Sequence, residues 1–204
     1  LGIASLNLGF GGEGSGGEYH SIYDSYDHFT RFKDPGFVYG ILLSKTAGRV
    51  VLRLANAAIL PVDFSSFYQT VSGYTTEVKT LADNMRLETE QENQMVKNRL
   101  FDVALDPTKT IKAPVAKEPV PFLDFSKLDN ALVELKTAST LFKTQVQKAD
   151  QLTVEKMVSL NAILYKAERS LLQEKGLPRR PWYKHQIYAP GFYTGYGVKT
   201  LPGV

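Results

Sequence analysis

The sequence predicts a mainly α-helical protein in two parts: a piece of an α/β sheet domain at residues 1–61 and a helical bundle domain at residues 62–204. Two observations predict the first part. Residues 1–10 are apolar on both alternating faces, and a glycine-rich loop follows them at residues 11–18. Three later amphipathic stretches, each opened by a residue that can cap a helix, predict the bundle.

The composition is that of an ordinary globular protein. Of the 204 residues, 43% are hydrophobic and 22% are charged, and the net charge of +3 is too small to indicate nucleic-acid binding. Because there is no cysteine, disulfides and thiolate metal sites are excluded. The most apolar long stretch, residues 37–60, carries Lys45, Arg49 and Arg53, so no membrane span is predicted. The chain begins without methionine or a charged leader, and we expect an internal piece of a longer protein without a signal peptide of its own.

Residues 1–10 are predicted to form a strand that is buried on both faces, as in a parallel sheet covered by helices. A helix is the alternative, but Gly2 and Gly9 disfavour it. In open α/β sheets, ligands bind at the carboxyl ends of the strands. Tyr19 and His20 follow the loop that leaves this strand, so they lie where a site is expected.

The rest of the first part is predicted to be helical. Residues 21–32 fit a short helix or turn. Asp34 and Pro35 then start a longer helix, because aspartate caps helix N-termini and proline suits the first helical position. We expect this helix to be largely buried, to run to about residue 60 and to stop at Pro61.

Three further helices are predicted for the bundle. Asp63 caps the first, Asp124 or Ser126 opens the second, and Thr153 caps the third. Their apolar stripes repeat at three- and four-residue steps: Phe64, Phe67, Val71, Tyr74, Val78, Leu81 and Met85; Phe125, Leu128, Leu132, Leu135, Ala138, Phe142 and Val146; and Met157, Leu160, Leu164, Ala167 and Leu171.

The segments around these helices follow from their composition. Residues 88–98 are polar and extend the first helix into solvent, and residues 109–121 hold three prolines and form an irregular connection. Gly176 suits the residue after a helix end, and Pro178 prevents continuation. The aromatic tail, residues 177–204, is expected to pack on the fold as an ordered crossover. Three helices leave one seam of a bundle open, so the last helix is expected outside this chain or from a partner.

Several motifs in the same order resemble those of a known family. They are Tyr-His-Ser-Ile-Tyr-Asp-Ser at residues 19–25, Asp-Pro-Gly-Phe at residues 34–37, and the stretches 54–61, 176–183 and 185–190. Together they resemble the two-zinc aminopeptidase and carboxypeptidase superfamily, in the branch of glutamate carboxypeptidase II and the transferrin receptor. The resemblance covers nearly the whole chain and is weakest at residues 86–121. It implies the C-terminal remnant of an α/β zinc-peptidase domain followed by a transferrin receptor-like helical dimerisation domain.

The resemblance also implies roles for single residues. His20 matches the family's last zinc ligand, and Tyr19 matches a tyrosine whose hydroxyl helps to hold the developing oxyanion. Tyr196 matches a tyrosine that binds the terminal carboxylate of the substrate. Asp24 either orients His20 through a hydrogen bond or caps the following turn. In the family the other zinc ligands and the general base lie upstream of these motifs, so this fragment alone is expected to be inactive.

The sequence departs from the family pattern at positions that bind acidic substrates. Gly195 stands where glutamate carboxypeptidase has a lysine, and Asn7 and Gly9 stand where it has two arginines. A preference for acidic substrates is therefore not implied. His20 is kept, whereas the transferrin receptor has lost its zinc ligands, and this difference favours an active peptidase.

Each candidate residue also has a structural interpretation. In isolation, His20 is an ordinary loop histidine, Tyr19 is a packing residue and Tyr196 is part of a turn. Glu13 and Glu18 are near enough in sequence to join a cation site, but they are more typical of solvated loop carboxylates.

The first hypothesis is the C-terminal part of a zinc-dependent exopeptidase that hydrolyses small peptides with two zinc ions and forms a homodimer through its helical domain. The family implies a periplasmic or secreted location. The alternative is a non-catalytic, receptor-like homologue whose helical domain mediates protein association. A free-standing helical interaction module is the third hypothesis.

Overall fold

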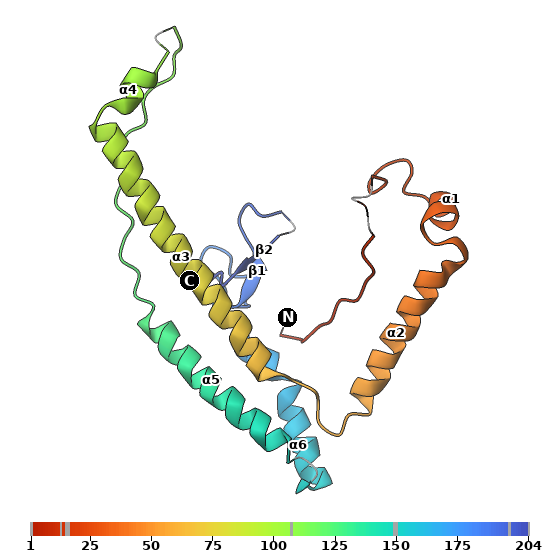
Figure 1. Cartoon of the computed structure of the whole chain (residues 1–204). Helices are drawn as coiled ribbons and strands as arrows, with labels where there is room; N and C mark the ends of the chain where they lie inside the picture. The colour runs from red at the N-terminus through yellow and green to blue at the C-terminus, as the bar shows by residue number, and fades with distance from the viewer. Residues whose placement is uncertain are drawn as a thin grey trace. The chain divides into compact units, whose positions relative to one another are not determined.

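The computed structural model describes residues 2–12, 14, 17–106, 108–148, 151–195 and 197–203. The chain forms two compact units: Leu1–Val62 with Gln151–Ser170, and Asp63–Asp150 with Leu171–Val204. Helices dominate both units (Figure 1), so the prediction of a mainly α-helical chain is confirmed. These units do not decide the predicted domain division into residues 1–61 and 62–204, which stays a prediction.

The first unit combines short helical turns with two longer helices. Its elements are α1 (Tyr26–His28), the π-helical η1 (Phe29–Lys33), the 3₁₀ turn η2 (Pro35–Phe37), α2 (Val38–Ala55) and α6 (Val154–Leu164), which the 3₁₀ turn η4 (Ala167–Leu171) follows. The prediction of a short helix or turn within residues 21–32 is confirmed.

The strand predicted for residues 1–10 is wrong. The described residues 2–10 form no regular element, and Leu6 and Phe10 are 66% and 55% exposed instead of buried on both faces. A strand needs hydrogen-bonding neighbours, and the described part of the first unit contains no strand that could supply them. Phe10 instead contacts Tyr39 edge to face, with ring centroids 5.9 Å apart.

Asp34 determines how α2 begins. Its buried carboxylate accepts hydrogen bonds from the backbone N–H groups of Tyr39 at 3.0 Å and Gly40 at 2.8 Å. Two donors that a helix N-terminus would leave unpaired are thereby satisfied, so the capping by Asp34 is confirmed. The predicted bounds are wrong: Pro35 lies in the separate turn η2, and α2 ends at Ala55 and not near residue 60. The expectation that α2 is largely buried is wrong: no described residue of the helix is buried, because the described part of its unit does not cover its apolar side.

Asn161 explains why α6 joins the first unit. Its side-chain amide donates to the carbonyl of Ala58 at 2.9 Å, and its carbonyl oxygen accepts from the N–H of Leu60 at 2.8 Å. The segment after α2 is thereby fixed to α6. Thr153 caps α6 through the N–H of Lys156, as predicted, but the helix ends at Leu164 and does not continue to residue 171.

The second unit contains the longest helix of the described chain. Its elements are α3 (Phe64–Lys97), α4 (Leu100–Ala104), α5 (Ser126–Val146), β1 (Tyr188–Pro190) and β2 (Val198–Thr200). Asp63 caps α3 as predicted, accepting from the N–H groups of Ser65 at 2.9 Å and Ser66 at 3.2 Å. The polar residues 88–97 are part of α3, which confirms the predicted extension.

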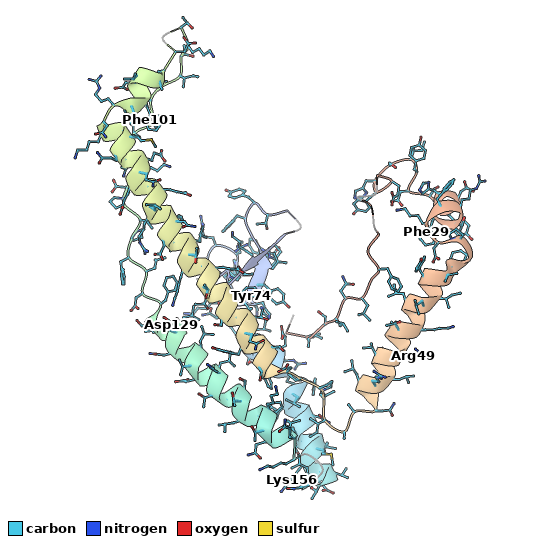
Figure 2. The ribbon with its side chains drawn as sticks, viewed as in Figure 1. Phe29, Arg49, Tyr74, Phe101, Asp129 and Lys156 are labelled. Atoms are coloured by element: carbon cyan, nitrogen blue, oxygen red, sulfur yellow. The ribbon has the colours of Figure 1, made fainter. Side chains whose placement is uncertain are left out.

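Helices α3 and α5 run antiparallel and side by side (Figure 1). Asp129 lies near the start of α5 (Figure 2). It pairs with Lys79 of α3 at 2.6 Å, and Phe64 meets Phe142 edge to face with ring centroids 5.0 Å apart. One contact lies near each end of α5, so they fix the register of the two helices.

The connection between the two helices is irregular at residues 109–121, as predicted, but it is not loose. The Asn93 side chain makes a pair of hydrogen bonds with the backbone of Lys117, at 2.8 Å and 2.7 Å. Further along, Arg86 donates to the carbonyl of Pro121 at 3.2 Å. The first half of α3 thus contacts α5, and its second half contacts the connection that leads to α5.

The tail forms a small antiparallel hairpin, in which Tyr188 pairs with Thr200 and Pro190 with Val198. Leu177 is the most deeply buried apolar side chain of this region, at 2% exposed. The prediction of an ordered tail is confirmed, but Trp182 is 68% exposed and is not packed away as expected. Among the described helices, none is both long and apolar enough to cross a membrane.

Candidate functional site

The predicted site residues Tyr19 and His20 are the two central residues of a tight turn. The N–H of Ser21 donates to the carbonyl of Glu18 at 2.9 Å and closes the turn. The Ser21 hydroxyl donates to the same carbonyl at 2.7 Å and accepts from the N–H of Tyr23 at 3.1 Å. The Ser21 hydroxyl therefore joins the carbonyl of Glu18, before the turn, to the N–H of Tyr23, after it.

His20 has a backbone conformation that non-glycine residues rarely adopt. Its φ is +58°, in the left-handed region. Histidine is among the few side chains enriched there, and strained backbone is concentrated at functional sites. The strain makes His20 a better functional candidate than its position in a loop does alone.

The rings of Tyr19 and His20 lie against each other. Their centroids are 3.8 Å apart and the ring planes are tilted by 39°. Tyr19 is 74% exposed, and His20 is also exposed. The imidazole and the phenol are thus held together at a surface, where both are accessible to a metal ion or a substrate.

The described contacts do not test the predicted role of Asp24 beside His20, and another residue caps the helical turn that follows. The Asp24 carboxylate makes no described hydrogen bond to His20, and the residue that caps α1 is Ser25, which accepts from the N–H of His28 at 3.2 Å. Asp24 instead lines a small hollow of about 190 Å³ with Glu18, Tyr23 and Lys33 among others. A role for Asp24 beside His20 stays a prediction.

Glu18, at the start of the turn, is engaged by Lys33 of η1. The Lys33 ammonium forms an ion pair with one carboxylate oxygen, and the other oxygen accepts from the N–H of Gly17 at 3.0 Å. The hydrogen bond from Lys33 is the main cause that lowers the pKa of Glu18 from 4.5 to about 2. Because this contact joins the turn to the helical segment that follows it, it helps to hold the site in place.

The Glu18–Lys33 pair should make the turn sensitive to acid. The lowered pKa means that the contact stabilises the fold fully above pH 4.5 and is lost as the pH falls through about 2. We expect the NMR shift of the Gly17 N–H to titrate with a midpoint near 2, and the midpoint should rise towards 4.5 in Lys33→Met. The exposed Lys45→Met serves as the control and should leave the midpoint unchanged. A wild-type midpoint near 4.5 contradicts the pairing.

The third predicted site residue, Tyr196, lies outside the described residues. The structure describes the loop on both sides of it. The Thr194 hydroxyl accepts from the N–H of Gly191 at 2.8 Å and donates to the carbonyl of Gly197 at 2.5 Å, and Gly195 has a φ of +56°. That Tyr196 and His20 serve one site stays a prediction.

His20 is chemically suited to bind zinc, but it is one donor only. A catalytic zinc site takes three protein ligands, and imidazole nitrogen is a common one. Among the described residues there is no group of three or more His, Asp or Glu side chains that could hold a metal ion. The described residues can therefore supply one ligand of a metal site, but not a complete set of ligands.

Sequence reasoning missed Lys33 and the structural role of Ser21. The partner of Glu18 is 15 residues away, a separation that no local pattern predicts. Ser21 could have been found, because serine next to a turn commonly hydrogen-bonds the backbone around it.

Comparisons with known proteins show which proteins this chain is similar to. Residues 123–204 match the transferrin receptor-like dimerisation domain. The chain is 29% identical over 208 residues to a probable glutamate carboxypeptidase of Arthroderma benhamiae, a match that covers 100% of this chain and 24% of the relative. It is 31% identical over 189 residues to the probable glutamate carboxypeptidase LAMP1 of Arabidopsis thaliana, covering 91% of this chain and 22% of the relative.

The likeness extends to aminopeptidases. The chain is 26% identical over 215 residues to the aminopeptidase NAALADL1 of Rattus norvegicus, covering 100% of this chain and 24% of the relative. The resemblance that the motifs indicate is thus confirmed. The chain spans about a quarter of the length of these relatives.

Proposed function

We propose that this chain is the C-terminal part of a zinc-dependent exopeptidase that hydrolyses small peptides. The observation that carries the proposal is the turn of residues 18–21, which presents an exposed histidine in a strained conformation beside an exposed tyrosine. The relatives named as carboxypeptidases and aminopeptidases support the same reaction class.

His20 supplies one zinc ligand in this proposal. Two zinc ions are proposed for the full-length protein, and the remaining ligands come from residues outside this chain. When bound, zinc lowers the pKa of a coordinated water and polarises a carbonyl. The Ser21 hydrogen bonds hold the backbone of the turn on which His20 lies.

Tyr19 and Tyr196 contact the substrate in this proposal. The Tyr19 hydroxyl donates a hydrogen bond to the substrate carbonyl oxygen as negative charge develops on it. Tyr196 binds the terminal carboxylate. Asp24 orients His20 in this proposal. Its side chain must first move so that the carboxylate reaches the imidazole. A preference for acidic peptides is not proposed, because Asn7, Gly9 and Gly195 lack the cations that would bind a second carboxylate.

The helical domain serves to join two copies of the protein. The match of residues 123–204 to a dimerisation domain supports a homodimer. Large apolar side chains remain exposed on both helices of the antiparallel pair: Leu81, Met85 and Leu87 on α3, and Val133 and Leu141 on α5. Burying such side chains against a second copy is favourable. The proposal also includes an extracytoplasmic location, which cell fractionation tests.

The function is tested by assaying the full-length protein against N-acyl dipeptides and against aminoacyl anilides. Peptidase activity should be removed by a zinc chelator and restored by added zinc. Hydrolysis of the dipeptides identifies a carboxypeptidase, and hydrolysis of the anilides identifies an aminopeptidase. A full-length protein that binds no zinc and cleaves neither class contradicts the proposal and favours the non-catalytic, receptor-like alternative.

Tyr19→Phe should lower kcat on the order of a hundredfold, because it removes one hydrogen-bond donor to the oxyanion. KM should change little, since the donor acts mainly in the transition state. Tyr23→Phe is the matched control, an exposed tyrosine four residues away, and it should retain full activity. Equal kinetics in the two variants would remove Tyr19 from the mechanism. Steady-state kinetics of the full-length protein give both numbers.

A further inference from the structure

Asn161 of α6 binds the segment that follows α2 through both polar atoms of its side chain. The amide nitrogen donates to the carbonyl of Ala58 at 2.9 Å, and the amide oxygen accepts from the N–H of Leu60 at 2.8 Å. The asparagine amide thereby makes the pair of bonds that the backbone of a neighbouring strand would make. We call these two hydrogen bonds the Asn161 clamp. They fix the segment after α2 from a position 101 and 103 residues away in the sequence.

The Asn161 clamp lies directly at the end of α2. In the turn that ends this helix, the N–H of Ala57 donates to the carbonyl of Leu54 at 3.3 Å, and the next residue, Ala58, accepts from Asn161. Leu164 lies three residues after Asn161 on the same face of α6, and it is 5% exposed, so this face is packed. Because consecutive residues are bonded to α2 and to α6, the clamp fixes the end of α2.

The other end of α2 is joined to the turn that carries His20. Asp34 caps α2, and Lys33, next to it in the sequence, forms the ion pair with Glu18. The carbonyl of Glu18 accepts the hydrogen bond that closes the turn. Between these two ends α2 is a continuous helix of 18 residues, about 27 Å long at 1.5 Å per residue. A tilt at the end of α2 therefore displaces its start, and with it the contacts of the turn.

We propose that Asn161 is a positioning residue for the site at His20, a role that rests on the proposed peptidase function. The clamp fixes the direction of α2, and α2 in turn fixes Asp34, Lys33 and the turn. Within the described part of the chain no residue of α2 is buried, so the contacts at its two ends set its direction there. Asn161 lies within residues 123–204, so the helical domain holds the segment that carries the site.

The first test measures the kinetics of the full-length protein at a temperature well below its melting point. Asn161→Leu keeps the size of the side chain and loses both hydrogen bonds. It should lower kcat roughly tenfold, because small displacements of reacting groups are costly. KM should change little, because the displaced groups act in the transition state. Ser159→Leu places a leucine on the exposed side of α6 and should retain the wild-type kcat.

The second test follows the same contacts without an activity assay, by hydrogen–deuterium exchange of the full-length protein. In Asn161→Leu, the N–H groups of residues 56–60 should exchange about fivefold faster, as expected for the loss of one hydrogen bond. Exchange of residues 17–25 should rise as well. Lys33→Met should raise exchange of residues 17–25 alone, and adding Asn161→Leu to it should not raise their exchange further.

Two results overturn the proposal. One is a wild-type kcat in folded Asn161→Leu, which would leave Asn161 with a purely structural role. The other is faster exchange of residues 56–60 with unchanged exchange of residues 17–25, because the clamp then does not act on the turn. If Asn161→Leu fails to fold, Asn161→Ser removes the clamp without adding apolar surface and should give the same changes. A wild-type protein without peptidase activity contradicts the proposed function, whereas the exchange measurement still decides whether the clamp acts on the turn.

Discussion

Gly176→Ala is expected to destabilise the second unit by about 3 kcal/mol or more. Gly176 has a φ of +65°, where a side chain costs about 1–2 kcal/mol. A Cβ there would lie 2.2 Å from the carbonyl oxygen of Pro181, and that atom belongs to the backbone and cannot move aside alone. Overpacking of this kind typically costs another 1–3 kcal/mol. Chemical denaturation of the wild type and the variant measures the difference.

Two glycines of the same unit separate the clash from the conformational cost. Gly195 also has a positive φ, of +56°, but a Cβ there meets nothing within 4 Å. Gly195→Ala should therefore cost only about 1–2 kcal/mol. Gly73 lies inside α3 in open space, and Gly73→Ala should stabilise by about 0.5–1 kcal/mol. If Gly176→Ala lowers the free energy of unfolding by no more than Gly195→Ala does, the result contradicts the close approach of Gly176 to Pro181.

His20→Ala should remove peptidase activity of the full-length protein almost completely. Loss of a residue that only supports a metal ligand typically costs 10- to 100-fold, so loss of the ligand itself should exceed about a hundredfold. Added zinc should not restore the rate, because the missing group is a donor and not the metal. Steady-state kinetics at several zinc concentrations measure this.

The matched control is His28→Ala. His28 is a second histidine close by in sequence, and its ring contacts Phe32 with centroids 5.2 Å apart. It lacks the strained backbone of His20, and its variant should keep most of the activity. Comparable losses in the two variants would show that histidines in this segment act through folding alone.

The capped helices α3 and α6 were the most predictable part of the fold. Asp63 and Thr153 cap them through hydrogen bonds to residues two or three positions away, and such local contacts can be read from the sequence. Residues 2–10 show the limit of this approach. Their apolar pattern is compatible with a buried strand, but a strand forms only where other strands pair with it. The apolar side of α2 is exposed because no described element of its unit covers it, and a periodic pattern does not show whether such an element is present.

The candidate site was predictable only through family resemblance. His20 has no local signature beyond its position after a glycine-rich loop, and its positive φ became visible only in the structure. The pairing of Glu18 with Lys33 depends on a contact across 15 residues. Such contacts are set by packing, which no periodic pattern in the sequence encodes.

The most direct test of the central claim is the zinc content of the full-length protein and its variants after dialysis against metal-free buffer. We expect about two zinc ions per chain in the wild type and in His28→Ala. At least one of them should be lost in His20→Ala, while circular dichroism shows that the fold is retained. Unchanged zinc content in a folded His20→Ala variant would contradict the claim that this turn supplies a zinc ligand.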